Sequence, residues 1–149
     1  MRRLDPDLAA PLYVAWQITN ECNLACSFCY RDPTRVDRLS LAEVRAVMER
    51  LPVRSVNLGT GENGLHPEFR EIVAYLRGQP VKLTMTSNGH SVAVTPDEDL
   101  PAFKDIEFSL DYPTKAEQDG QRGDGNWDLL HEQARRCRRL GVPVTFIAV

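Results

Sequence analysis

The chain lacks the features of a membrane protein, a secreted protein or a nucleic-acid-binding protein. No apolar run reaches the ~20 residues that a membrane-spanning helix needs. Arg2 and Arg3 are followed by a mostly polar segment rather than an apolar one, so no secretory signal is visible. The 18 Lys and Arg against 21 Asp and Glu give a net charge of −3, without the basic excess that a nucleic-acid backbone attracts. We therefore expect neither a membrane nor a nucleic acid as partner.

Cysteine is also scarce, with four in 149 residues, and its placement does not resemble a disulfide framework. This favours a reducing, cytoplasmic location. Three of the four, Cys22, Cys26 and Cys29, have the spacing C-x3-C-x2-C directly after the apolar run 12–18. A single zinc ion would usually take a fourth Cys or His at motif spacing, and none lies nearby. Thiolates also hold iron–sulfur clusters, usually through four ligands, so three would leave one iron open to another ligand.

The rest of the chain has an ordinary globular composition, with 42% hydrophobic and 26% charged residues. Apolar strand candidates alternate with amphipathic helices, and this pattern predicts an α/β fold with a parallel sheet. Ser40 and Glu43 form a capping box before the first helix. The crossover at 95–100 is weak, with Thr95 as its N-cap, and 112–126 reads as a polar loop. The strands are expected at 12–19, 53–58, 81–86, 105–111 and 142–149. The helices are expected at 41–51, 67–77 and about 126–140, the last capped by Asn126 or Asp128.

Unusual residues follow several of these strands, where parallel sheets bind their ligands. The three cysteines follow the first strand and a glycine-rich turn, 59–64, follows the second. Three glycines in six residues indicate tight turns and close approach of the backbone to another group. The polar residues at the ends of the third and fourth strands are Ser87, Asn88, Ser109 and Asp111.

The string 19–30, with Phe28 before the last cysteine, resembles the cluster motif of radical S-adenosylmethionine (radical SAM) enzymes. Its sequence is similar to the branch of peptide and cofactor maturases. Gly61 and Glu62 resemble the second half of the family's Gly-Gly-Glu-Pro motif, although Thr60 replaces the first glycine and Asn63 the proline. The resemblance implies a [4Fe-4S] cluster that cleaves S-adenosylmethionine reductively and yields a 5′-deoxyadenosyl radical.

The resemblance also implies roles for individual residues. Cys22, Cys26 and Cys29 would hold the cluster, Glu62 the amino group of the methionine moiety, and Arg122 its carboxylate. Ser109 and Asp111 would hold the ribose hydroxyls. The full set of implied cofactor-binding residues is Phe28, Tyr30, Gly61, Glu62, Ser87, Asn88, Ser109, Asp111 and Arg122.

Simpler interpretations remain open for each of these features. The glycines can form an ordinary strand-to-helix turn. Ser109 and Asp111 can cap a strand end, and Arg122 can be a solvated surface charge. Cys137 lies on an apolar helix face and is expected in the core.

The implied architecture is a partial parallel (β/α) barrel with five strands and about four crossovers. Residues 1–11 are expected as a lead-in, and 12–149 as a radical SAM core domain that stops within its fifth strand. A flavodoxin or ferredoxin is the expected electron donor, and a peptide or small molecule the substrate. The alternatives are a non-enzymatic metal- or iron–sulfur-binding α/β protein, or an inactive fragment.

Overall fold

The computed structural model describes residues 12–148, so the expected lead-in at 1–11 lies outside the described residues. Two single-turn 3-10 helices, Asn63–Leu65 and Leu100–Ala102, interrupt the connections. The helices are α1 (Leu41–Arg50), α2 (Phe69–Arg77), α3 (His90–Val94), α4 (Lys115–Arg122) and α5 (Asn126–Arg139). The strands are β1 (Leu12–Trp16), β2 (Val53–Leu58), β3 (Lys82–Ser87), β4 (Asp105–Ser109) and β5 (Val144–Ile147).

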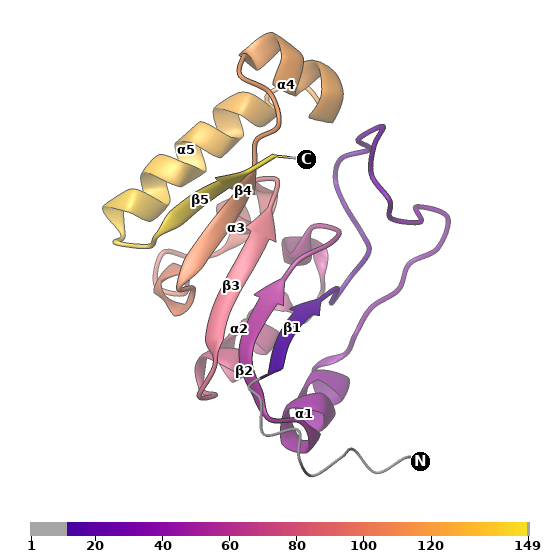
Figure 1. Ribbon diagram of the computed structural model, residues 1–149, viewed down its shortest axis with the longest axis vertical. Coiled ribbons are helices and arrows are strands. Elements are labelled where there is room, and N and C mark those ends of the chain that lie inside the picture. Colours follow the sequence, from indigo (N-terminus) through magenta and orange to yellow (C-terminus); the bar gives the residue numbers. More distant parts are fainter. Residues whose placement is uncertain (1–11, 149) are drawn as a thin grey trace.

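The strands form one parallel sheet in the order of the chain, β1-β2-β3-β4-β5. Four crossovers join them: α1, α2, α3 with the second 3-10 helix, and the pair α4 and α5. The sheet does not close, because β1 and β5 each pair with one strand within residues 12–148. The predicted α/β class, parallel order and unclosed five-stranded sheet are confirmed (Figure 1).

The helices bury one face of the sheet. Alternate strand residues point into this core, where they meet Val44 of α1, the apolar side of α2, Val92 of α3 and Leu130 of α5. Burying such side chains drives folding of a two-layer α/β domain. The sheet residues of this core, all buried, are Trp16, Val53, Val56, Leu58, Leu83, Met85, Ile106 and Phe108.

The opposite face of the sheet is polar on its central strands. In β4, buried Ile106 and Phe108 alternate with the half-buried Glu107 and Ser109. Parallel pairing carries the same alternation to the neighbours, since Thr86 of β3 pairs with Glu107 and Asn57 of β2 pairs with Thr84. This polar face ends at the loop 17–39, which rises beside the carboxyl ends of the strands (Figure 1).

Local sequence signals explain several helix boundaries. The Ser40–Glu43 capping box is present, with the Ser40 side chain accepting from the Glu43 amide and the Glu43 carboxylate accepting from the Ser40 amide. Gly78 caps the end of α2, and Gly141 follows α5 with φ +71°. Cys137 is fully buried in the core, as predicted.

Three local predictions were wrong. Residues 112–126 do not form a loop throughout, because Thr114 caps α4, which is almost entirely polar. Thr95 does not begin a helix but ends α3. The α5 helix begins after Gly125, whose φ of +82° sets the turn, rather than being capped by Asn126 or Asp128.

No helix within residues 12–148 is both long enough and apolar enough to cross a membrane.

Candidate functional site

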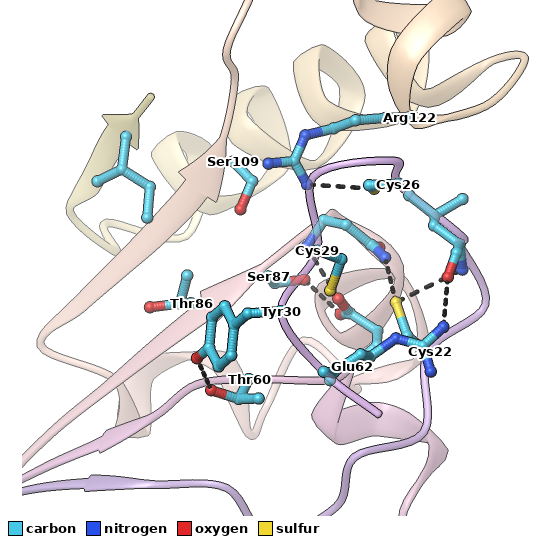
Figure 2. Close-up of a pocket in the computed structure, with 15 residues that line it drawn as sticks. Cys22, Cys26, Cys29, Tyr30, Thr60, Glu62, Thr86, Ser87, Ser109 and Arg122 are labelled. Carbon is cyan, nitrogen blue, oxygen red and sulfur yellow. Dashed lines mark hydrogen bonds between the residues drawn. The ribbon is translucent and has the colours of Figure 1, made fainter. Parts of the chain in front are cut away.

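A cavity of about 200 Å³ lies at the carboxyl ends of the strands (Figure 2). The loop after β1, the turn after β2, the ends of β3, β4 and β5, and helix α4 all contribute to it. It is lined by Cys22, Leu24, Cys26, Cys29, Tyr30, Arg31, Thr60, Gly61, Glu62, Thr86, Ser87, Asn88, Ser109, Arg122 and Ile147.

Polar contacts within the cysteine loop, 17–39, fix its conformation. The Asn20 side chain donates to the carbonyls of Asp32 and Arg35 and accepts from the amide of Asp37. Arg38 forms two hydrogen bonds to the Glu21 carboxylate, which lower the pKa of Glu21. Arg31 donates to the carbonyl of Leu24 at 2.8 Å inside the loop. These bonds order a segment that has no regular secondary structure of its own.

The three thiols face the same cavity but do not form a compact metal-binding group within the described residues. Cys22 and Cys26 are partly buried and Cys29 is exposed. Burial raises the pKa of Cys22, and the nearby Glu62 carboxylate adds to this shift. Asn88 Nδ2 lies 3.5 Å from Cys22 Sγ. Three thiols on one ordered loop, without His or carboxylate ligands among them, fit the soft donor set of an iron–sulfur cluster.

The turn after β2 presses its backbone against this loop. Thr60 and Gly61 both have left-handed conformations, with φ of +61° and +66°. A Cβ on Gly61 would lie 2.4 Å from the Thr19 carbonyl oxygen, so only glycine fits there. The Glu62 amide donates to the Glu21 carbonyl at 2.6 Å. The close approach predicted from the glycines is therefore between this turn and the start of the cysteine loop.

Glu62 is 1% exposed and holds the end of β3 in place. Its carboxylate accepts from Ser87 Oγ at 2.6 Å, from the Asn88 amide at 2.9 Å and from the Ser91 amide at 2.6 Å. These bonds bring Glu62, Ser87 and Asn88 together, from turns 25 residues apart in the chain. Glu62 is thus both a lining residue of the cavity and a structural link between the second and third strand ends (Figure 2).

Arg122 is not a solvated surface charge. It lies on α4, its side chain is 9% exposed, and its Nε pairs with the Asp111 carboxylate, itself 3% exposed. Its guanidinium lies 5.3 Å from the centre of the Phe28 ring, and Nη1 lies 4.0 Å from Cys26 Sγ. The terminal nitrogens of Arg122 therefore remain at the cavity while Asp111 orients the group (Figure 2).

The structure brings most of the predicted site residues together. Tyr30, Gly61, Glu62, Ser87, Asn88, Ser109 and Arg122 line the same cavity as the cysteines, whereas Phe28 and Asp111 adjoin it through Arg122. Sequence reasoning missed five lining residues, Leu24, Arg31, Thr60, Thr86 and Ile147. Thr86 was the last residue of a predicted strand, so its position at a carboxyl end could have identified it.

The molecule is thus an α/β domain with an open parallel sheet, in which three thiols and a buried acid line one cavity at the carboxyl ends of the strands. The sequence pattern of the radical SAM superfamily matches residues 16–149, and the chain belongs to this superfamily of enzymes. The resemblance inferred from the cysteine motif is confirmed.

Curated relatives of the chain include maturases and a cyclase. The chain is 33% identical over 158 residues to the mycofactocin maturase MftC of Mycobacterium tuberculosis, covering all of this chain and 40% of the relative. It is 31% identical over 138 residues to a probable GTP 3′,8-cyclase of Pyrococcus horikoshii, covering 85% of this chain and 43% of the relative. The chain thus spans less than half the length of these relatives.

Among solved structures, Streptococcus suis SuiB bound to S-adenosylmethionine has a TM-score of 0.75 at 19% identity. SuiB bound to its precursor peptide SuiA has a TM-score of 0.77 at the same identity. Each match covers 93% of this chain and about a third of SuiB. At this identity the likeness shows a shared fold.

Proposed function

We propose that residues 12–149 form the core domain of a radical SAM enzyme that modifies a peptide, protein or cofactor precursor. One observation carries this proposal: the three motif thiols share a cavity with Glu62, Ser109 and Arg122, brought from three other parts of the chain. Membership of the superfamily supports the same interpretation.

Cys22, Cys26 and Cys29 would hold a [4Fe-4S] cluster, with one iron free of protein ligands. When bound and reduced, this cluster supplies the electron that cleaves S-adenosylmethionine to a 5′-deoxyadenosyl radical, which abstracts hydrogen. The loop anchors at Asn20 and Arg31 would hold the thiols at the cavity. Because thiolates are the ligands, loading would release protons from the three thiols.

The charged lining suits the two ends of an amino acid moiety. Glu62 would accept from the cofactor's ammonium, with the Gly61 backbone beside it. Arg122, oriented by Asp111, would bind the carboxylate through its terminal nitrogens. Ser109, which lines the cavity, would face the ribose, whereas Asp111 adjoins the cavity through its ion pair with Arg122 and would act by holding that side chain. Phe28, Tyr30, Ser87 and Asn88 would complete the cofactor site.

The relatives support a class of substrate. Relatives named as maturases, and a SuiB structure with its precursor peptide, favour a peptide. A flavodoxin or ferredoxin would donate the electron. All four cysteines are unpaired, which supports a reducing, cytoplasmic compartment.

Anaerobic reconstitution with iron and sulfide tests the proposal. The expected result is a broad visible absorption that dithionite bleaches, followed by release of 5′-deoxyadenosine when S-adenosylmethionine is added. A colourless protein that takes up zinc instead would overturn it and favour a structural metal site.

A further inference from the structure

A second cavity, of about 450 Å³, adjoins the first on the polar face of the sheet. The two share Tyr30, Thr60 and Thr86, but none of the cysteines lines the second one. A molecule held there would lie beside the cofactor residues without touching the thiols. The remaining lining residues are Ala15, Trp16, Gln17, Asn57 and Gly59.

A hydrogen-bond network fixes the polar wall of this cavity. Asn57 is 4% exposed, and its Nδ2 donates to Thr84 Oγ1 at 2.9 Å and to Glu107 Oε2 at 3.3 Å. A carboxylate only accepts, so this contact defines which end of the Asn57 amide carries the nitrogen. The Asn57 carbonyl oxygen, Oδ1, therefore points toward Thr86.

The wall has more acceptors than donors. Thr86 has one hydroxyl proton and two acceptors in reach, Glu107 Oε2 at 2.7 Å and Asn57 Oδ1 at 3.2 Å. The proton goes to the carboxylate, because charge-assisted bonds are shorter and stronger. Asn57 Oδ1 is then left with the longer of the two Thr86 contacts, and a carbonyl oxygen can accept a further donor.

Glu107 makes this wall negative. No Lys, Arg or His in the described part of the chain pairs with its carboxylate. The nearest charge on its own strand face is another acid, Asp105, which accepts from Thr145 Oγ1. The carboxylate thus attracts cations to the neighbouring oxygens of Asn57 and Thr86, which can each accept a further donor.

Gly59 keeps these acceptors open. Its backbone is not left-handed, so conformation does not require glycine here. A Cβ at this position would lie 2.8 Å from Asn57 Oδ1 and 3.8 Å from Thr86 Oγ1. The missing side chain therefore leaves space directly over Asn57 Oδ1, where a further donor can approach.

We propose that this cavity is a substrate subsite that binds a cationic N–H donor, an ammonium or guanidinium group of a peptide. The group donates to Asn57 Oδ1 and Thr86 Oγ1, and Glu107 acts through them as a positioning residue. As a substrate subsite, this assignment rests on the proposed function.

The test uses three small probes and needs no turnover. N-acetyl-lysine methylamide carries the cation, N-acetyl-norleucine methylamide has a similar shape without it, and N-acetyl-glutamate methylamide has the opposite charge. Each is titrated into the isotope-labelled full chain while NMR follows the side-chain amide of Asn57 and the backbone amide of Gly59. We expect saturable shifts with the lysine probe and about tenfold weaker binding of the other two.

Variants then separate the subsite from the fold. Glu107→Gln should remove the preference for lysine over norleucine, and Gly59→Ala should block all probes. Ser55→Ala, on the same strand face but outside the cavity, should change neither. Thermal unfolding reports whether each variant is folded. If Gly59→Ala does not fold, the test rests on whether Glu107→Gln loses the preference for the lysine probe over the norleucine probe.

Equal binding of the three probes, or an unchanged lysine preference in Glu107→Gln, would overturn the subsite. Iron content and S-adenosylmethionine binding are measured on the same samples. A chain that loads iron and the cofactor but gives no Asn57 response refutes the subsite alone. A chain that binds the lysine probe but neither iron nor cofactor refutes the proposed function and retains a cation site.

Discussion

The two faces of the sheet are built from the same strands and have opposite roles. In β4, Ile106 and Phe108 are fully buried under the helices, while Glu107 and Ser109 face the polar side. Because the helix-covered face supplies the apolar burial, the polar face can carry two acceptors that share one hydroxyl donor, one of them an acid with no cationic partner among the described residues. Because successive side chains of a strand point to opposite faces, the residues that stabilise the core and the polar residues that line the cavities lie on different faces of the sheet.

The cysteines extend this comparison, because three of them line the cavity at the strand ends whereas the fourth, Cys137, lies in the core. Replacing Cys22, Cys26 or Cys29 by Ala should abolish iron loading after reconstitution, measured as iron per chain. Cys137→Ala should keep it, because Cys137 is fully buried in the apolar core. Burial also raises the pKa of Cys137 to about 11, so iodoacetamide at pH 8 should modify the exposed Cys29 and leave Cys137 intact.

Loss of iron in Cys137→Ala equal to that in the three loop variants would contradict this division. Cys137 would then act as a fourth ligand, and the open iron would be absent.

Neighbouring residues on β4 give a second test. Phe108→Ala should lower the free energy of unfolding by about 3–5 kcal/mol, because it empties a fully buried position. Glu107→Gln, of nearly unchanged shape on the opposite face, should lower it by less than about 1 kcal/mol, since the two partners of its carboxylate can still donate to the amide oxygen. Urea unfolding measures both. Equal losses would mean that the polar face stabilises the fold as strongly as the core.

The sequence was sufficient for the features that depend on local chemistry. Alternation predicted β4, the Ser40–Glu43 box predicted the start of α1, and the polar strand ends predicted most of the cavity lining. It failed at α4, because almost no residue of that helix is apolar. The helix is instead held by Gln118, which is fully buried and forms hydrogen bonds with the Ser109 carbonyl, the Asp111 amide and the Asn126 side chain. A single buried polar residue gives no periodic pattern in the sequence.

The network of the second cavity was also beyond the sequence. Asn57, Thr86 and Glu107 lie on three strands up to 50 residues apart, and only the strand register brings their side chains together. Likewise, the motif match identified Arg122 but could not show that Asp111 orients it.

Glu62→Gln should weaken both roles of this residue. If Glu62 binds the cofactor's ammonium, calorimetry should show affinity for S-adenosylmethionine reduced by about 1.5–3 kcal/mol, with iron content retained. Both carboxylate oxygens accept from buried donors, so the new NH₂ group must face one of them, which should cost about 1–3 kcal/mol of stability. Glu98→Gln, at an exposed position, is the control. Unchanged affinity would leave Glu62 with its structural role alone.

The smallest effect is expected at Thr60, where the two cavities meet. Its left-handed backbone costs about 1–2 kcal/mol for a residue with a Cβ, while its hydroxyl bonds Tyr30 Oη at 2.6 Å. Thr60→Ala keeps the strain and loses the bond, so it should destabilise by about 1 kcal/mol. Thr60→Gly loses the bond but relieves the strain, and should stay within about 1 kcal/mol of the natural chain. In a Tyr30→Phe background, Thr60→Ala should have no further effect, which a double-mutant cycle of unfolding free energies measures. An equal loss of stability in the Ala and Gly variants would contradict the role of backbone strain at Thr60. An effect of Thr60→Ala that persists without the Tyr30 hydroxyl would contradict the role of the hydrogen bond.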